Sequence, residues 1–249
     1  MYQGLLIFHM DGFDFQYAIA LDCETGQTVW RSERNVEYGT DNGDYYKAFS
    51  TPLVIQMDQQ EQLISPASMA LLSLDPKTGI ERWRVRYEEH STTARPVFDG
   101  QRLYISTGFS KAKMMCVRAD GQGDVTESHV DWAEQRGIGC KPSPVLVRGR
   151  LFVLSDDGVI SRLDLRTGEP VWRQRLGGKF SASLVATSEH LLATDHDGKS
   201  YVFNVDDEPE LISENSLDDG CNASPAIISQ TLLLRTTRSE ERRVGKECR

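Results

Sequence analysis

A ten-residue motif that occurs three times constrains this chain more than any other feature of its sequence. The motif reads Leu-Asp-x-x-Thr-Gly-x-x-x-Trp and begins at Leu21, Leu74 and Leu163. Steps of 53 and 89 residues separate the three copies, and the longer step leaves room for a degenerate copy between them. That copy runs from Val117 through a longer loop to Trp132. Such self-similarity indicates a fold built from repeated supersecondary units.

The motif predicts a turn followed by a strand that carries the Trp. Asp and Thr side chains can hydrogen-bond the amides of their own turn, and Gly takes the left-handed conformation that the turn needs. We expect each Trp to lie against the neighbouring repeat, because a single small sheet cannot bury two apolar faces alone. The structural positions of the repeat are Asp22, Thr25, Gly26, Trp30, Asp75, Thr78, Gly79, Trp83, Trp132, Asp164, Thr167, Gly168 and Trp172.

A second recurring element is a strand start, with Pro at four of its five occurrences. Its marker positions are 52, 96, 144, 184 and 225, which lie 40 to 48 residues apart. This is the period of a four-stranded propeller blade. The repeat that begins at residue 143 shows the pattern best, with strands expected at 143–147, 151–155, 159–163 and 170–175. Short strands with turn signals about every ten residues predict an all-β fold.

The predicted fold is therefore an all-β propeller with about five to six blades present, incomplete at both ends. Residues 4–8 and 232–236 each have the pattern of a second strand of a blade. We assign residues 1–237 to the propeller. The segment 238–249 continues no pattern, contains five basic and three acidic residues, and resembles translated vector sequence. We predict that this tail is disordered and exclude it from the fold.

Composition excludes several classes of function. The net charge of −9 disfavours binding to phosphate backbones, so we expect no nucleic-acid partner. No apolar run approaches the roughly 18 residues of a membrane-spanning helix. The five cysteines form no Cys-x-x-Cys pair, which indicates neither a zinc site nor a disulfide framework.

Local motifs that could carry chemistry have simpler interpretations. Gly198-Lys199-Ser200 lacks the upstream Gly of a phosphate-binding loop, since position 193 is Ala. It follows Asp195-His196-Asp197 between two expected strands and is predicted to be a hairpin turn. Asp156-Asp157-Gly158 is the equivalent turn one repeat earlier. The five histidines are interpreted as lone surface or half-buried residues, and we predict no catalytic or metal-binding residue.

The repeat resembles the pyrroloquinoline-quinone (PQQ)-like repeat of quinoproteins over roughly residues 4–236. Two branches carry this repeat. Quinoprotein alcohol dehydrogenases have eight blades, PQQ and calcium, whereas proteins of the bacterial outer-membrane assembly factor B (BamB-like) family have eight blades and no cofactor. The sequence is most similar to the second branch, in particular to bacterial homologues of the planctomycete type.

The resemblance implies a non-catalytic scaffold in the periplasm or cell envelope, which binds protein partners on loops and edge strands. The first alternative is a dehydrogenase that uses PQQ and calcium. That branch needs a bonded pair of adjacent cysteines, a Trp floor, a catalytic Asp and Glu/Asn calcium ligands. No Cys-Cys pair occurs here, and the repeat accounts for all four Trp. The second alternative is a glycan-binding propeller, because Phe13, Phe15, Tyr45 and Tyr46 lie in expected loops.

The remaining candidate site is the central channel of the propeller. Residues one and three before each strand marker share a face, because side chains alternate along a strand. Small hydroxyl residues dominate these positions, and small size is simply what fits near an axis. The alternative is an anion-accepting mouth formed by the two cations, Arg95 and Lys141. The candidate residues are Thr51, Arg95, Lys141, Ser143, Ser181, Ser183, Asn222 and Ser224.

Overall fold

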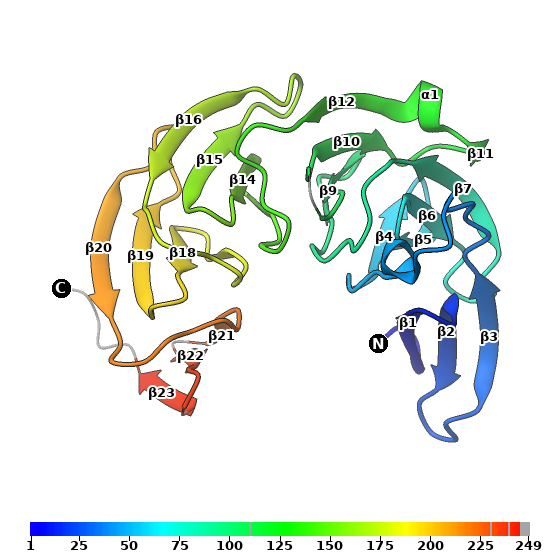
Figure 1. Ribbon diagram of the computed structural model, residues 1–249, viewed down its shortest axis with the longest axis horizontal. Helices are drawn as coiled ribbons and strands as arrows, with labels where there is room; N and C mark the ends of the chain where they lie inside the picture. Colours follow the sequence, from blue (N-terminus) through cyan, green and yellow to red (C-terminus); the bar gives the residue numbers. More distant parts are fainter. Residues whose placement is uncertain (110, 230, 239, 245–249) are drawn as a thin grey trace. The chain divides into compact units, whose positions relative to one another are not determined.

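The structure, a computed structural model, describes residues 1–109, 111–229, 231–238 and 240–244, and it is almost entirely β (Figure 1). The chain forms two compact units, and each is described by itself. The first comprises Met1–Arg136 together with Arg166–Gly168. The second comprises Gly137–Leu165 together with the residues from Glu169 onward. Each sheet contains three or four strands that pair in chain order, the meander of a propeller blade.

The first unit contains three sheets built on antiparallel strands that pair in chain order. Four such strands, the predicted number, form the framework of the second and third sheets, and three form the first. The first sheet consists of β1 (Leu5–Asp11), β2 (Gln16–Asp22) and β3 (Thr28–Glu33), the second of β4 (Leu53–Met57), β5 (Gln60–Pro66), β6 (Ala70–Leu74) and β7 (Glu81–Arg86), and the third of β8 (Val97–Phe98), β9 (Arg102–Ser106), β10 (Met114–Arg118) and β12 (Val130–Glu134).

The degenerate copy of the motif contains more structure than the longer loop that the sequence predicted. The inserted residues form β11 (Gly123–Asp124) and the short helix α1 (Thr126–His129). β11 pairs in parallel with β7 of the preceding sheet, opposite Trp83 and Arg84. The insertion therefore adds a fifth strand to the second sheet before the chain continues into β12.

The second unit repeats the same meander. The blade that the sequence described best has its third and fourth strands at the predicted bounds, and its first two strands differ by one or two residues. The strands are β13 (Val145–Val147), β14 (Arg150–Leu154), β15 (Val159–Leu163) and β16 (Pro170–Arg175), then β17 (Val185–Ala186), β18 (His190–Thr194), β19 (Lys199–Asn204) and β20 (Leu211–Ser216), and finally β21 (Ala226–Ile228), β22 (Thr231–Arg235) and β23 (Glu240–Val244).

The tail differs in part from its predicted disorder. Residues 240–244 form β23, which pairs antiparallel with β22 over five residues. A ladder of backbone hydrogen bonds needs only an unpaired neighbouring edge and a chain that can extend, so a charged sequence does not prevent it. Residues 239 and 245–249 lie outside the described residues.

The middle strands of the second sheet are mostly buried, on both faces. All five residues of β6 are buried, whereas β16 alternates between half-buried and exposed residues. Ile64 of β5 and Leu71 of β6 belong to one hydrophobic cluster, and their neighbours Leu63 and Leu72 belong to another. Because adjacent side chains of a strand point to opposite faces, the second sheet lies between two cores. This burial explains the continuous apolar sequence of the middle strands.

The Asp-x-x-Thr-Gly turn has the predicted chemistry. Oδ1 of Asp22 accepts hydrogen bonds from the backbone N–H groups of Glu24 and Thr25 and from the Thr25 hydroxyl. These bonds stabilise the carboxylate, with Thr25 the main contributor, and lower the pKa of Asp22. Gly26 and Gly79 have φ angles of +70° and +72°, the left-handed conformation that Gly adopts most readily.

The Trp of one repeat packs on the turn of the next, as the sequence predicted. Trp30 is 7% exposed, and its Nε1 donates to the carbonyl of Pro76 at 3.1 Å. A Cβ added to Gly79 would lie 2.5 Å from the ring of Trp30. Trp132 covers Gly168 in the same way, at 2.4 Å. Gly79 and Gly168 are therefore required for two reasons, the φ angle and the indole that packs on each of them.

Candidate functional site

The predicted channel residues divide between the two units. Ser143, Ser183 and Ser224 in the second unit form a hydrogen-bonded series between successive inner strands. The N–H of Ser143 donates to Oγ of Ser183 at 3.0 Å, and the N–H of Ser183 donates to Oγ of Ser224 at 2.9 Å. Two of the hydroxyls therefore connect neighbouring blades, in addition to being small enough for this position.

The other channel candidates have separate surroundings. Oγ of Ser181 lies 2.7 Å from Nε2 of His196. Lys141 and Asn222 are exposed in the second unit, and Arg95 is exposed in the first. Because Arg95 and Lys141 lie in different units, the anion-accepting mouth remains a prediction. Thr51, the remaining candidate, lines a cavity in the first unit.

This cavity has a volume of about 560 Å³ and is formed by two chain segments. One segment is 7–15, which contains most of β1 and the turn after it. The other is 48–52, which leads into β4. The carbonyl of Asp11 accepts a hydrogen bond from the N–H of Ala48 at 3.3 Å and so joins the two segments at one end. The volume lies within the range of ordinary ligand sites.

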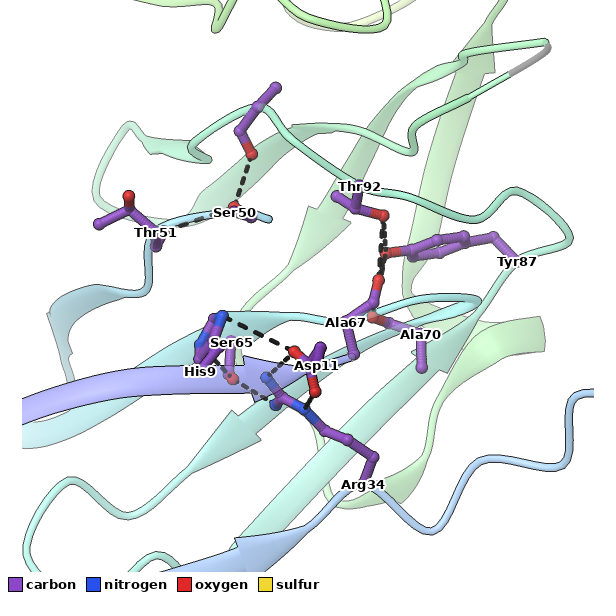
Figure 2. Close-up of polar contacts among 11 residues, drawn as sticks. His9, Asp11, Arg34, Ser50, Thr51, Ser65, Ala67, Ala70, Tyr87 and Thr92 are labelled. Atoms are coloured by element: carbon purple, nitrogen blue, oxygen red, sulfur yellow. Dashed lines mark hydrogen bonds and ion pairs between the residues drawn. The ribbon is translucent and has the colours of Figure 1, made fainter. Parts of the chain in front are cut away.

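Beside the cavity lies a buried polar network that the sequence interpretation did not detect (Figure 2). Arg34 donates from Nε and Nη2 to the two carboxylate oxygens of Asp11, at 2.9 and 2.7 Å, and from Nη1 to Oγ of Ser65 at 2.5 Å. Oγ of Ser65 also lies 2.9 Å from Nε2 of His9. The side chains of Arg34 and Asp11 are each 1% exposed, and this bidentate geometry is what compensates such burial.

The electrostatics of the network keep His9 neutral. Burial and the positive charge of Arg34 hold the pKa of His9 well below its usual value. Burial raises the pKa of Asp11, and the hydrogen bonds and charge of Arg34 oppose this shift. Since Arg34 can only donate to Ser65, the Ser65 hydroxyl is free to donate to Nε2 of His9. Nδ1 of His9 lies 4.0 Å from Oδ2 of Asp11.

The order Ser65, His9, Asp11 is that of a hydrolytic triad, but the geometry does not support nucleophilic catalysis. The distance of 4.0 Å between His9 and Asp11 is too long for a hydrogen bond. The carboxylate is instead engaged by Arg34, and Ser65 is fully buried. A nucleophile must reach its substrate and pass its proton to an oriented base. We therefore interpret the network as structural: its hydrogen bonds join the first sheet to the second.

His9 is a correction to the interpretation of the histidines as surface or half-buried residues. Its side chain is only 4% exposed. The signal that could have identified it is the pattern His9-x-Asp11 on one strand, since residues two apart share a face. The turns at 156–158 and 196–198, in contrast, are hairpin turns as predicted, with Gly158 and Gly198 at φ angles of +76° and +84°.

Around the cavity and the adjoining loops lies a group of exposed aromatic side chains, named here the aromatic loop face. Their exposed fractions range from 37% to 60%. Tyr45 and Phe109 are linked through His90, whose ring lies 4.4 Å from that of Tyr45 and 5.7 Å from that of Phe109. The three other members line the cavity. The members are Phe13, Phe15, Tyr45, Phe49 and Phe109.

Buried hydrogen bonds hold these loops in place (Figure 2). The hydroxyl of Tyr87 donates to the carbonyl of Ala67 at 2.8 Å, and its burial raises the pKa of Tyr87. Thr92 bonds the carbonyls of Ala67 and Thr107 at 2.9 and 2.7 Å. The Ser50 hydroxyl donates to the carbonyl of Ala94 at 2.8 Å. These buried hydrogen bonds thus connect the loops that carry the aromatic loop face.

Among the described residues, no group of three or more His, Cys, Asp and Glu side chains gathers into a potential metal site. Trp30, Trp83 and Trp132 are buried at their repeat positions, so none of these three offers a free face for a quinone. We derive no cofactor chemistry from these residues. Within the described part of the chain, no helix is long and apolar enough to cross a bilayer.

Comparison with solved structures identifies the fold. The chain is 13% identical to quinohemoprotein alcohol dehydrogenase from Comamonas testosteroni, over 86% of this chain and 42% of that chain, with a TM-score of 0.64. It is 12% identical to the β-propeller domain of Cps50 (Swd1) from Myceliophthora thermophila, over 94% and 76%, with a TM-score of 0.64. At such identities the likeness shows a β-propeller and nothing finer.

Three further comparisons concern the family. BamB from Moraxella catarrhalis is 15% identical over 96% of this chain and 81% of that chain, with a TM-score of 0.49. A comparison with curated protein sequences gave no match. The family model described as outer membrane protein assembly factor BamB matches residues 4–130 and 119–211. Together these two matched segments of the family model include most of the repeats, and the chain belongs to this BamB-like family of PQQ-repeat β-propellers.

Proposed function

We propose that this chain is a non-catalytic binding propeller that engages protein partners in the bacterial envelope. The aromatic loop face is the observation that carries this proposal. Contiguous exposed apolar side chains are uncommon on soluble monomers and mark interaction sites. Aromatic residues are also enriched at the centres of protein interfaces. The family description, outer membrane protein assembly factor, supplies the expected setting.

The surroundings of the aromatic loop face suit a binding surface better than a flexible loop cluster. Nζ of Lys47 lies 4.2 Å from the ring centre of Phe13, and the N–H of Phe49 donates to the carbonyl of Thr92 at 2.7 Å. Phe109 likewise donates its N–H to the carbonyl of His90 at 2.7 Å. Rings that are held in place before binding lose little entropy when a partner covers them.

The proposal is tested by site-specific photo-crosslinking in cells of the source organism. A photoreactive amino acid replaces Phe15 or Phe49 in the full chain, and Val171 in the second unit provides the matched control. Phe49 is 60% exposed and Val171 is 49% exposed, so access is comparable. We expect discrete crosslinked proteins from the two Phe positions, at least severalfold above the control. Equal crosslinking at all three positions would contradict the proposal.

A glycan-binding propeller is the second candidate, favoured by the same exposed rings, because aromatic faces also stack on sugars. A glycan array probed with the purified chain separates the two. Saturable glycan binding that is lost in Phe15→Ser and Phe49→Ser variants, together with no protein crosslinks, would replace the protein partner with a saccharide. The quinoprotein alternative receives only fold-level support from its structural neighbour.

A further inference from the structure

The degenerate copy of the motif changes the surroundings of one Trp of the repeat. The indole N–H of Trp30 donates to the carbonyl of Pro76, in the intact turn of the next copy. The turn that follows Trp83 is the degenerate one, residues 119–123, with the sequence Ala-Asp-Gly-Gln-Gly. Nε1 of Trp83 donates instead to Oε1 of Gln62, at 2.9 Å, within its own sheet. The degenerate turn therefore lies beside the second sheet without repeating the hydrogen bond of an intact turn.

A second cavity, named here the insertion cavity, borders this turn. One part of its lining is residues 120–123 of the degenerate turn, and another is the hairpin that joins β4 to β5. Gln62 of β5 and Arg82 and Trp83 of β7 complete the lining, and all of these residues belong to the first unit. The volume of about 560 Å³ lies within the range of ordinary ligand sites.

Hydrogen bonds hold the lining of the insertion cavity in place. Gln62 is 6% exposed, and its Oε1 also accepts from the Ser73 hydroxyl at 2.7 Å. Because the indole of Trp83 can only donate, the orientation of the Gln62 amide is fixed. Its Nε2 donates to the carbonyl of Ala119 at 2.9 Å, and β11 pairs with β7 at the other end of the turn (Figure 1). A cavity that is formed in advance loses little entropy when a ligand binds.

The lining contains both committed and uncommitted polar groups. Arg82 donates to Asp75 at 2.6 Å and to Oε1 of Gln60 at 3.1 Å, so its charge is already paired and the Gln60 NH₂ group is left to donate. The exposed side chains of Asp58 and Gln122 make no hydrogen bond or ion pair within the described part of the chain. The uncommitted groups therefore include a carboxylate, which can only accept, and amide NH₂ groups, which can only donate.

This combination selects the chemistry of a ligand. An ammonium or guanidinium group only donates, so it cannot use the amide NH₂ groups of Gln60 and Gln122. An anionic ligand only accepts, and it would face Asp58 and Asp120 in a chain of net charge −9. A hydroxyl both donates and accepts through one oxygen. An uncharged ring that carries adjacent hydroxyls can therefore bond the carboxylates and the amides together.

We propose that the insertion cavity binds a neutral saccharide. Hydroxyls of the sugar donate to the carboxylates of Asp58 and Asp120 and accept from the amides of Gln60 and Gln122. Hydrogen bonds to a charged acceptor are the strongest of these, so affinity depends most on the carboxylates. Asp58 is the better test, because Oδ1 of Asp120 also lies 3.5 Å from Nε2 of His129. The inference goes beyond the proposed function, since no member of the aromatic loop face lines this cavity.

Saturation-transfer NMR on the full chain tests the inference with four neutral disaccharides: cellobiose, lactose, maltose and N,N′-diacetylchitobiose. We expect saturable binding of at least one, which Asp58→Asn weakens about tenfold or more, because a hydrogen bond to a charged acceptor is lost. Asn tolerates the left-handed φ angle of +47° at this position, so the variant should fold normally. Asp206→Asn is the matched control, since Asp206 is exposed and lies outside the cavity, and it should leave binding unchanged.

The amide side of the cavity is tested separately. Gln122→Ala should weaken binding of the same disaccharide about three- to tenfold, the range for one neutral hydrogen bond. Gln27→Ala is its control, because Gln27 is an exposed Gln of the first unit that does not line the cavity. Hydrogen exchange locates the site independently of the variants, and we expect the bound sugar to slow exchange in segment 120–123.

Three results would overturn the inference. All four disaccharides present adjacent hydroxyls, so the absence of saturable binding by every one of them contradicts it. Binding that is lost in Phe15→Ser and Phe49→Ser but kept in Asp58→Asn would place the sugar on the aromatic loop face. If arginine amide bound more tightly than any disaccharide and lost affinity in Asp58→Asn, the cavity would be a site for cations. Crosslinking of partner proteins at Phe15 or Phe49 uses different residues, so the proposed function stands or fails independently.

Discussion

Neighbouring sheets in the two units are joined by different chemistry. In the first unit a buried ion pair between Asp11 and Arg34, with Ser65 and His9, connects the first two sheets. In the second unit neutral serine hydroxyls accept backbone N–H groups from one blade to the next. Neighbouring sheets are thus joined in two ways, but a buried charge depends on its partner far more than a neutral hydroxyl does.

The largest difference should appear when one member of the charged network is removed. Arg34→Met leaves the Asp11 carboxylate buried without its partner, and we expect the free energy of unfolding to fall by about 3–5 kcal/mol. Urea denaturation followed by Trp fluorescence measures this well, because Trp30, Trp83 and Trp132 all lie in the first unit. The double variant Asp11→Leu with Arg34→Met should recover most of the loss.

Arg31→Met is the matched control for the charged network. Arg31 forms an exposed pair with Glu33, in which the side chains are 44% and 53% exposed. Exposed pairs contribute at most about 1 kcal/mol, so its loss should be small. If Arg31→Met and Arg34→Met destabilised the chain equally, burial would not be the source of the difference between the two units.

A packing defect that involves no charge, in the same unit, gives a second reference for the loss in free energy of unfolding. Gly79→Ala combines a left-handed φ angle of +72° with a Cβ 2.5 Å from the ring of Trp30. We expect a loss of about 2–4 kcal/mol, from the conformational cost and from overpacking. Gly26 has a φ angle of +70° with open space around its Cβ position, so Gly26→Ala should cost only about 1–2 kcal/mol. Thermal unfolding of both variants checks the ratio, and equal losses would show that the indole moves aside.

Acid should affect the charged network through His9. The folded chain holds the pKa of His9 well below 6.5, so the unfolded chain binds a proton that the folded chain refuses. The contribution of His9 to stability is therefore complete above pH 6.5 and is lost as the pH falls below it. Between pH 7 and 5.5 the loss should reach about 1.3 kcal/mol. His9→Asn should remove this part of the slope, and an unchanged slope would contradict the assignment.

The repeat was predictable from sequence because its signals are local. The turn chemistry of Asp22 to Gly26, the marker at Pro144 and the strand bounds after it depend on residues only a few positions apart. The charged network joins residues 23, 31 and 56 positions apart, and it requires the register of three strands at once. A blade period predicts which strands are neighbours, but it does not predict which polar side chains meet between them.

The cavity beside β1 shows the same limit from another direction. Thr51 was a candidate because of its place before a strand marker, and the structure puts it in the wall of the cavity. The sequence could not distinguish it from Ser183, which has the same repeat position. The difference is that Ser183 accepts a hydrogen bond from Ser143, whereas Thr51 lies beside β1 in the cavity wall. Equivalent repeat positions therefore differ in their contacts when their neighbours differ.

The smallest expected effect is the loss of one hydroxyl in the second unit. Ser183→Ala removes the acceptor for the N–H of Ser143, a bond of 3.0 Å, and should cost about 1 kcal/mol. Hydrogen exchange of segments that contain β13, β17 and β21 measures it locally, with faster exchange expected at Ser143 and little change in the first unit. Ser183→Thr, which keeps a hydroxyl, is the control. A loss near that of Arg34→Met would mean that the neutral series is as indispensable as the ion pair, because removing one hydroxyl would then disrupt the packing of neighbouring blades.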